Sequence, residues 1–199
     1  MAVSERLRAF LDEAKVPYTV MKHPTVYTAQ EIAAAQHVPG RQLAKSVLVN
    51  TDRGPVLAVL PAIFRIDLKR LKSATGARTL TIAKEPDVKA AFPDVEVGAM
   101  SPFGTLYQVS VVAEHSLESE ESLVFNAGSH TETVKMRTRD FLALVKPKVA
   151  AFGAHVSGTP AAKKKRAAKQ GRLKQRKHAT SPPRARTPAK RPTQTRARR

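Results

Sequence analysis

Apolar residues recur at helical spacing at the start of the chain. Leu7 and Leu11 lie on one helix face after Ser4, a candidate N-cap, and Pro17 follows the last residue of this pattern. This pattern predicts an amphipathic helix that ends before Pro17. A short strand is expected next, over residues 18–22.

A capping box marks the start of a second helix. In Thr28-Ala-Gln-Glu31, the side chains of Thr28 and Glu31 satisfy each other's backbone N–H groups. The helix is expected to run to about His37. It should end at Val38-Pro39-Gly40, because Pro and Gly interrupt helical structure.

The clearest strand pattern lies in the middle of the chain. Residues 45–51 and 55–60 are rich in β-branched and apolar side chains, and Asp52-Arg53-Gly54 between them is typical of a turn. These runs predict a β-hairpin. Both faces of the second run are apolar, which predicts a central strand pair covered on both sides.

Shorter elements are expected in the remainder of the first 158 residues. Asp67 and Gly76 are the expected cap and end of a short helix, and Thr138 is the expected cap of the last helix. A loop rich in Gly and Pro is expected over residues 93–104. Another helix is predicted at residues 87–91, and strands are predicted at residues 79–82, 107–113, 123–127 and 133–136. This interleaving predicts an α/β fold in which helices surround a mixed sheet.

Charge divides the chain into two parts. The 199 residues include 35 Lys and Arg and 16 Asp and Glu, a formal charge of +19, and every acidic residue precedes Phe141. Residues 159–199 hold 16 of the Lys and Arg, so they carry +16 and residues 1–158 carry +3. A segment without aromatic or acidic residues cannot bury enough apolar surface to offset its chain entropy. We therefore expect one α/β domain over residues 1–158 and a disordered basic tail over residues 159–199.

Several classes of chemistry lose support from what the sequence lacks. There is no Cys, which excludes disulfides, thiol nucleophiles and Cys-ligated metals, and the six His lack metal-site spacing. Phosphate-loop, dinucleotide-binding, nucleophile-elbow and zinc-hydrolase motifs are absent. No apolar run approaches the ~20 residues needed to span a bilayer. We expect a cytoplasmic protein with no metal, no cofactor and no membrane partner.

Lys45 stands at an unusual place for a charged residue. By period-two alternation it shares a strand face with Val47 and Val49. Its ammonium could project from the strand end into a pocket for an anionic or carbonyl-bearing ligand. Alternatively, its stem lies along the edge of the core and its head reaches water. The pattern alone leaves both interpretations open.

Two loops carry further candidates for a site. Gly98-Ala-Met-Ser-Pro102, followed by Gly104, could aim backbone N–H groups at a ligand oxygen, or it could be an ordinary surface loop. Asn126-Ala-Gly-Ser-His130 joins two expected strands. Asn126 and His130 therefore either line a cleft at the sheet edge or belong to an exposed turn.

Taken in order, these segments resemble the YbaK/prolyl-tRNA-editing family of aminoacyl-tRNA deacylase domains. The resemblance covers about residues 3–152 and favours the pocket interpretation of Lys45 and the ligand-binding interpretation of the Gly98 loop. The segments that carry it are His23-Pro24, Tyr27-Thr28-Ala29, Ala44-Lys45-Ser46-Val47, Val56-Leu57-Ala58-Val59, Asp67-Leu68-Lys69, Gly98-Ala-Met-Ser-Pro102-Phe-Gly104 and Asn126-Ala-Gly-Ser-His130.

The resemblance implies a mixed α/β fold and a metal-independent trans-editing hydrolase. Such an enzyme cleaves the ester between a wrongly attached small amino acid, such as Ala, Ser, Thr or Cys, and the terminal ribose of tRNA. By position, Lys45, Gly98 and His130 are the implied catalytic residues. Lys45 would anchor the ribose end or the ester, and the Gly98 N–H would engage the substrate carbonyl. The implied substrate-binding residues are Ser46, Tyr27, Thr28, Ser101, Pro102, Asn126 and Gly128.

Two other functions stay open beside this one. A non-catalytic nucleic-acid-binding protein would act mainly through the tail, in which Ser181-Pro-Pro and Thr187-Pro-Ala-Lys resemble histone-tail composition. Alternatively, a deacylase-like body has lost catalysis and only binds aminoacyl ends. In each case we expect the tail to bind nucleic acid, with mischarged aminoacyl-tRNA as the implied partner. Phosphate contacts would give it salt-dependent affinity without sequence specificity.

Overall fold

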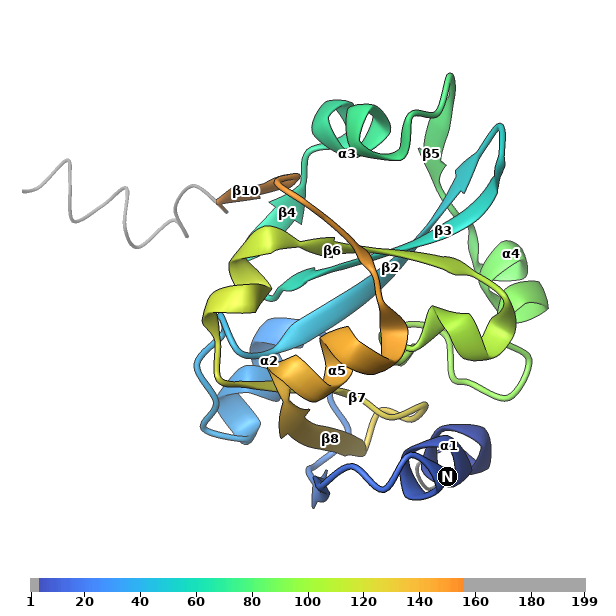
Figure 1. The fold of residues 1–199 in the computed structure, drawn as a ribbon. Coiled ribbons are helices and arrows are strands. Elements are labelled where there is room, and N and C mark those ends of the chain that lie inside the picture. Colours follow the sequence, from blue (N-terminus) through green and yellow to red (C-terminus); the bar gives the residue numbers. More distant parts are fainter. Residues whose placement is uncertain (1–3, 156–199) are drawn as a thin grey trace, which may run out of the picture. The chain divides into compact units, whose positions relative to one another are not determined.

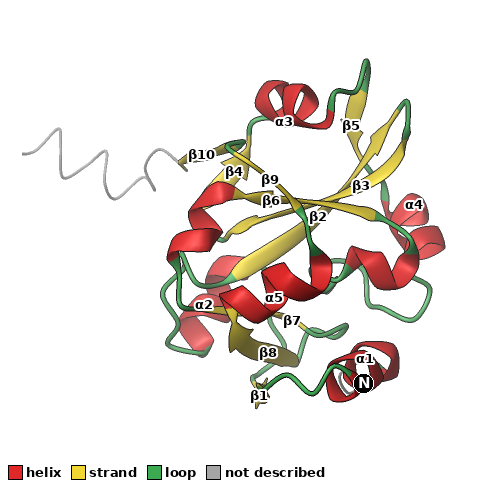
Figure 2. Cartoon of the chain, viewed as in Figure 1, coloured by secondary structure: helices red, strands yellow, loops and turns green. Residues whose placement is uncertain are grey.

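The computed structural model describes residues 4–155, so the predicted tail and its boundary at residue 158 lie outside the described residues. Helices and strands interleave along these residues, as the sequence predicted (Figures 1 and 2). The helices are α1 (Glu5–Glu13), α2 (Ala29–Ala35), α3 (Leu68–Thr75), α4 (Glu85–Ala91), α5 (Thr138–Val145) and the 3-10 helices η1 (Gly104–Tyr107) and η2 (His115–Ser119). The strands are β1 (Tyr18–Lys22), β2 (Ala44–Thr51), β3 (Gly54–Pro61), β4 (Phe64–Ile66), β5 (Leu80–Ile82), β6 (Ser110–Glu114), β7 (Ser122–Asn126), β8 (Glu132–Arg137), β9 (Lys148–Ala150) and β10 (Gly153–His155).

A five-stranded mixed sheet, in the order β5-β2-β3-β6-β9, forms the centre of the described residues. β2 and β3 make the predicted antiparallel hairpin, and β3 pairs in parallel with β6. Because β3 lies inside the sheet, the side chains of residues 57–60 are buried on both of its faces. The prediction of a central strand pair that is covered on both sides is thereby confirmed for β3.

Two apolar clusters cover the two faces of this sheet. On one face, a second antiparallel sheet, in the order β1-β8-β7, packs together with α1 and α5. Phe103 lies within this cluster, with its ring centroid 5.7 Å from those of Phe125 and Phe141. On the other face, Leu71 of α3 and Phe152 cover the sheet. This arrangement confirms the predicted fold class, a mixed sheet with surrounding helices.

Two of the predicted helix ends are confirmed in detail. Thr28 Oγ1 accepts a hydrogen bond from Glu31 N at 3.2 Å, and Glu31 Oε2 accepts one from Thr28 N at 3.0 Å, which completes the capping box of α2. The Asp67 side chain accepts the first backbone N–H groups of α3, and Gly76 ends that helix in the left-handed conformation. Local sequence therefore fixes where both helices lie.

Other local predictions hold only in part or were wrong. Ser4 is the N-cap residue of α1, as predicted, but its hydroxyl donates to Asp94 at 3.0 Å and makes no hydrogen bond to the helix. Thr138 is the first residue of α5 and not its cap. The strand predicted at residues 107–113 begins only at Ser110, because the chain first makes the 3-10 turn η1. No helix among residues 4–155 has the length and apolar composition of a membrane span.

Candidate functional site

A cavity of about 160 Å³ lies beside the first half of β2. β5 pairs with β2 only at residues 49–51, so residues 44–47 of β2 have no partner from β5 on that edge. α2, the Gly98 loop and the end of β7 supply the other walls. The lining residues are Tyr27, Ala29, Ile32, Leu43, Ala44, Lys45, Ser46, Val47, Gly98 and Asn126. The structure therefore brings together five predicted site residues: Lys45, Ser46, Tyr27, Gly98 and Asn126.

Lys45 lines this cavity, as the pocket interpretation of its position requires. Its Nζ donates to the backbone carbonyl of Phe64 at 2.6 Å, which fixes the end of the side chain. Burial, with a smaller contribution from the nearby charge of Arg65, lowers the pKa of Lys45 below its ordinary value. An ammonium group has three N–H donors, so two remain for a ligand.

Two polar side chains in the lining have unpaired atoms. Ser46 Oγ and Asn126 Oδ1 are buried, and neither has a hydrogen-bond partner among residues 4–155. An unpaired buried polar group costs roughly 1–3 kcal/mol, so it needs a specific explanation. A polar ligand that fills the cavity is such an explanation. Across the described part of the chain, no three His, Asp or Glu side chains gather as metal ligands would.

The Gly98 loop enters the cavity wall with a backbone conformation that suits glycine. Gly98 has a φ of 90°, and a Cβ placed there would lie 3.5 Å from Cε1 of His130. His130 Nε2 donates to the carbonyl of Val97 at 3.0 Å, and its backbone N–H donates to Glu96 Oε2 at 2.9 Å. His130 does not line the cavity. Its ring instead packs behind the loop and is held to it by the hydrogen bond to Val97.

Tyr27 is an exposed aromatic residue in the lining. Its side chain is 70% exposed, and its ring centroid lies 4.8 Å from that of His130. An aromatic face that is open to solvent beside a cavity can stack on a nucleic-acid base. Among the lining residues, Tyr27 is therefore suited to a part of the ligand that stays outside the cavity.

Four other predicted substrate-binding residues lie outside the lining. The Thr28 side chain caps α2, and Ser101 and Pro102 are buried within the Gly98 loop. Gly128 has a φ of 105°, and a Cβ there would lie 3.1 Å from Cβ of Ser4. Their positions support the walls of the cavity, and their predicted contact with substrate stays a prediction.

The apolar wall of the cavity was missed by reasoning from sequence. Ala29 and Ile32 come from α2, and Leu43 precedes β2. The capping box fixes the start of α2, and the i, i+3 spacing then places Ala29 and Ile32 on one face, which is a signal that could have grouped them. The Phe64 carbonyl that accepts the hydrogen bond from Lys45 Nζ lies on β4. This strand has three residues and no pattern in the sequence that predicts it.

Comparisons with known proteins agree with this geometry. Residues 23–144 match the model of the aminoacyl-tRNA editing domain. The prolyl-tRNA editing protein ProX of Acetoanaerobium sticklandii is 28% identical over 152 residues, which cover 73% of this chain and 92% of that protein. The multifunctional Ser/Thr-tRNA deacylase ProXp-y of Escherichia coli K12 is 28% identical over 153 residues, which cover 74% of this chain and 91% of that protein. A solved structure described as a candidate trans-editing enzyme for prolyl-tRNA synthetase has a TM-score of 0.70 at 20% identity and covers 77% of this chain and 98% of its own, which shows a shared fold.

The family match spans more than half of the chain, so this protein belongs to the aminoacyl-tRNA editing domain family. It is an aminoacyl-tRNA deacylase, and mischarged aminoacyl-tRNA is its substrate. The family and the class of enzyme that the sequence predicted are thereby confirmed.

Proposed function

We propose that this protein hydrolyses the ester that joins a small, wrongly attached amino acid to the terminal ribose of tRNA. The observation that carries the proposal is the cavity beside β2, which Lys45, Ser46 and Asn126 line together. The buried Ser46 Oγ and Asn126 Oδ1 have no hydrogen-bond partner among residues 4–155. The names of the relatives ProX and ProXp-y, which refer to editing of prolyl-tRNA and to Ser/Thr-tRNA, support the same chemistry.

Lys45 binds the oxygen atoms at the reacting end of the substrate. The hydrogen bond to the Phe64 carbonyl holds Nζ in place and leaves two N–H donors for the ester carbonyl or the ribose hydroxyls. A donor that is already fixed needs no reorganisation when negative charge develops on the carbonyl oxygen. The loss of one such donor typically lowers the rate by ~10²–10³.

The Gly98 backbone N–H is the second donor to the carbonyl in this proposal. Asn126 Nδ2 donates to the Gly98 carbonyl at 3.4 Å, and His130 Nε2 donates to the Val97 carbonyl at 3.0 Å, so the loop is held at two adjacent peptide groups. We assign His130 a positioning role on this evidence, because its ring contacts the loop and does not line the cavity.

Ser46 and Asn126 bind the amino acid itself. Asn126 Oδ1 is an acceptor without a partner among residues 4–155, so it suits the α-ammonium group, and the Ser46 hydroxyl can donate or accept. Among residues 4–155, no carboxylate or imidazole lines the cavity, and the proposal therefore assigns activation of the water to the ribose hydroxyl next to the ester. Tyr27 is free to stack on the terminal base.

The size of the cavity favours a small amino acid. Its volume is about 160 Å³, so the space beside its apolar wall is limited. The side chains of Ala, Ser, Thr and Cys fit this space beside Ala29 and Ile32. Because one methyl group changes discrimination by only ~10–200-fold, we expect overlapping activity on several of these amino acids.

Deacylation of a panel of mischarged tRNAs by the full chain tests the proposal. The wild-type protein should release at least one amino acid among Ala, Ser, Thr and Cys, and Lys45→Ala should lower that rate by ~10²–10³ without a change in melting temperature. Lys89→Ala, on the exposed face of α4, is the matched control and should keep the wild-type rate. Release by the wild type no faster than by Lys45→Ala would refute the proposed role of Lys45 in catalysis.

Residues 159–199 act in this proposal as a tether for tRNA. Their charge of +16 and their lack of acidic residues suit contacts with phosphate, which give affinity without sequence specificity. The same charge favours a second candidate, a nucleic-acid-binding protein that acts mainly through its tail. That candidate predicts tRNA binding by wild type and Lys45→Ala alike, together with no release of amino acid by either.

A further inference from the structure

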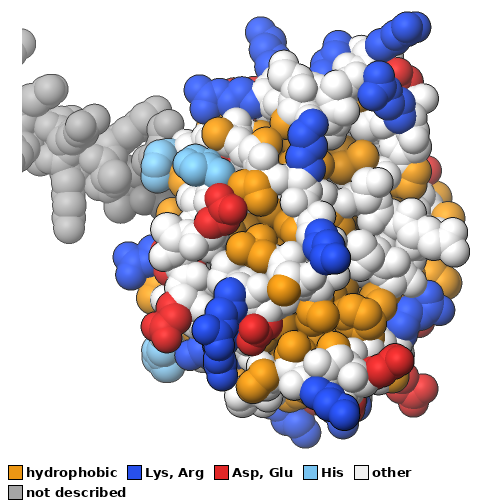
Figure 3. Space-filling model, viewed as in Figure 1, with side chains coloured by type: hydrophobic (Ala, Val, Ile, Leu, Met, Phe, Trp, Pro, Cys, Tyr) orange, Lys and Arg blue, Asp and Glu red, His pale blue; other side chains and the backbone are white. Residues whose placement is uncertain are grey.

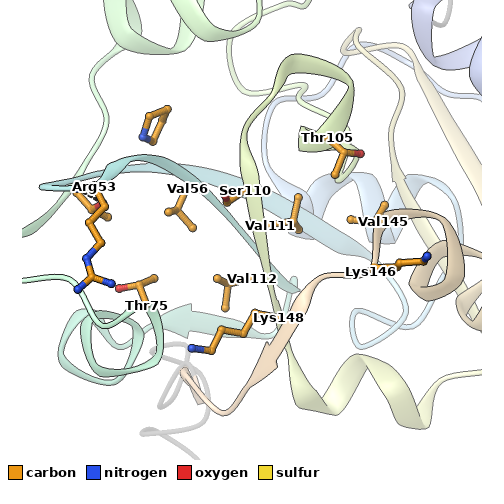
Figure 4. Close-up of a pocket in the computed structure, with 12 residues that line it drawn as sticks. Arg53, Val56, Thr75, Thr105, Ser110, Val111, Val112, Val145, Lys146 and Lys148 are labelled. Atoms are coloured by element: carbon orange, nitrogen blue, oxygen red, sulfur yellow. Dashed lines mark hydrogen bonds between the residues drawn. The ribbon is translucent and has the colours of Figure 1, made fainter.

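A second, larger cavity of about 460 Å³ lies near the start of β3 (Figure 4). Val56 and Val112 of the central sheet belong to its lining, together with hydroxyl side chains such as Ser110. Three basic residues also line it: Arg53 from the β2–β3 turn, Lys146 after α5 and Lys148 at the start of β9. We call this cavity the basic groove.

The charged side chains that line the basic groove are all positive. No Asp or Glu belongs to its lining, and Arg53, Lys146 and Lys148 are all exposed. Across residues 4–155, none of the three forms a salt bridge with a carboxylate. The neighbouring Asp52 carboxylate accepts hydrogen bonds from the backbone N–H groups of residues 78 and 79 through one oxygen, which lowers its pKa, and the charge of Arg53 adds to this effect. The groove is therefore electropositive and open to an anionic ligand.

Two of the cations lie together in this groove. Figure 4 shows Arg53 and Lys148 extending toward the same end, near Thr75, whereas Lys146 lies at the other end and points away. Arginine, lysine and hydroxyl side chains are among those that most often bind phosphate oxygens of nucleic acids, and all three line this groove. Figure 3 shows several Lys and Arg side chains over the upper part of the face in view.

We propose that the basic groove binds phosphate groups of the tRNA backbone while the aminoacyl end occupies the cavity of Lys45. This inference rests on the proposed function, because that function supplies the nucleic acid. The open groove, its hydroxyl side chains and its basic residues match a polyanionic strand. The contact belongs to the described residues and is separate from any contact by residues 159–199.

The distance between the two sites suits a single tRNA. Lys45 pairs with Leu60 across the hairpin, and Val56 in the groove lies four positions before Leu60 on β3. At ~3.3 Å per residue, the sites lie roughly 13 Å apart along the strand. A stacked nucleic-acid strand advances ~3.4 Å per phosphate, so about four nucleotides span this distance.

A double substitution tests the groove in the full chain. Arg53→Gln with Lys148→Gln removes the two adjacent cations, and Lys89→Gln with Lys135→Gln removes the same charge from exposed positions outside the groove. Binding of uncharged tRNA is measured against KCl concentration, and melting temperatures verify that both variants fold. The groove variant should have a salt slope shallower by about 1.4, or ~0.7 per lost contact, and a KM for mischarged tRNA raised roughly tenfold with kcat unchanged.

A short substrate separates failure of the groove from failure of the proposed function. An aminoacyl ester on a CCA trinucleotide is too short to fill both sites, so the groove variant should hydrolyse it at the wild-type rate. Equal salt slopes and equal KM values in the groove and control variants would overturn the proposal that the groove binds tRNA, even if the enzyme deacylates tRNA. Hydrolysis of neither substrate by the wild type would instead overturn the proposed function, and the binding of uncharged tRNA would still decide whether the groove contacts it.

Discussion

The backbone of Gly98 illustrates how a single residue shapes the site. Its φ of 90° lies in the left-handed region, where an L side chain costs about 1–2 kcal/mol. The Cβ of an alanine there would meet His130 at 3.5 Å, an ordinary van der Waals contact, so backbone strain is the main effect. We expect Gly98→Ala to lower the free energy of unfolding by about that amount and to lower kcat, because relief of the strain moves the backbone N–H away from the substrate carbonyl.

Gly54 provides the matched control for this substitution. It has a φ of 107°, and a Cβ placed there meets no atom within 4 Å. Gly54→Ala should therefore lose similar stability in denaturant unfolding while it keeps the kcat of the wild type. Equal kcat values for both variants would show that the Gly98 conformation does not serve catalysis.

The site residues were predictable from sequence to different degrees. Lys45 is anomalous on an apolar strand face, and its order with the Gly98 and Asn126 segments indicated the family. The unpaired state of Ser46 and Asn126 was not predictable, because it depends on which distant backbone groups reach them after folding. His130 was expected among the catalytic residues, whereas its bond to the Val97 carbonyl became visible only in three dimensions.

At the scale of elements, the cap of α2 ties helix stability to the shape of the cavity. α2 supplies Ala29 and Ile32 to the wall, and the Thr28 hydroxyl caps its first turn. Thr28→Ala should lower the free energy of unfolding by about 0.5–2 kcal/mol. It should also raise KM for mischarged tRNA, because a frayed α2 no longer holds the wall. Denaturant unfolding and steady-state deacylation measure the two effects, and Thr28→Ser, which keeps the hydroxyl, should behave as wild type.

The same cap predicts a dependence on pH. Hydrogen bonds from Thr28, first its side chain and then its backbone, hold the pKa of Glu31 below its ordinary value. A carboxylate with a lowered pKa in the folded state stabilises the fold above its ordinary pKa, and this contribution is lost as pH falls through the lowered pKa. The stability difference between wild type and Thr28→Ala should therefore shrink in acid. A constant difference across this range would argue against a capping role for Glu31.

Elements with their own local signals were predictable, and those that depend on partners were not. α2 and α3 begin at their predicted caps and α3 ends at Gly76, whereas α2 ends at Ala35 and not at about His37. The β2–β3 hairpin follows from its two apolar runs around a turn. β4, β9 and β10 have three residues each and pair only because the chain returns to the sheet after α5. Such short strands carry no periodicity that a sequence could show.

At the scale of the whole molecule, charge is distributed unequally along the sequence. Residues 159–199 carry +16 of the formal +19, and the remaining +3 belongs to residues that include the cavity and the basic groove. Residues 159–199 can therefore supply the general attraction to nucleic acid, while the cavity positions the ester. This division predicts that affinity and turnover respond to different changes.

A chain that ends at residue 158 tests this division and the proposed domain boundary. Its melting temperature and its kcat at saturating tRNA should equal those of the full chain, because the cavity lies within residues 27–126. Its affinity for tRNA should fall, and the slope of log affinity against log salt should become shallower by about 5.6 if half of the 16 charges contact phosphate, at ~0.7 per contact. A full-length variant with Gln in place of these Lys and Arg residues should match the truncated chain, since charge and not length is the proposed cause. Loss of kcat or a lower melting temperature in the truncated chain would instead make residues 159–199 part of the catalytic fold.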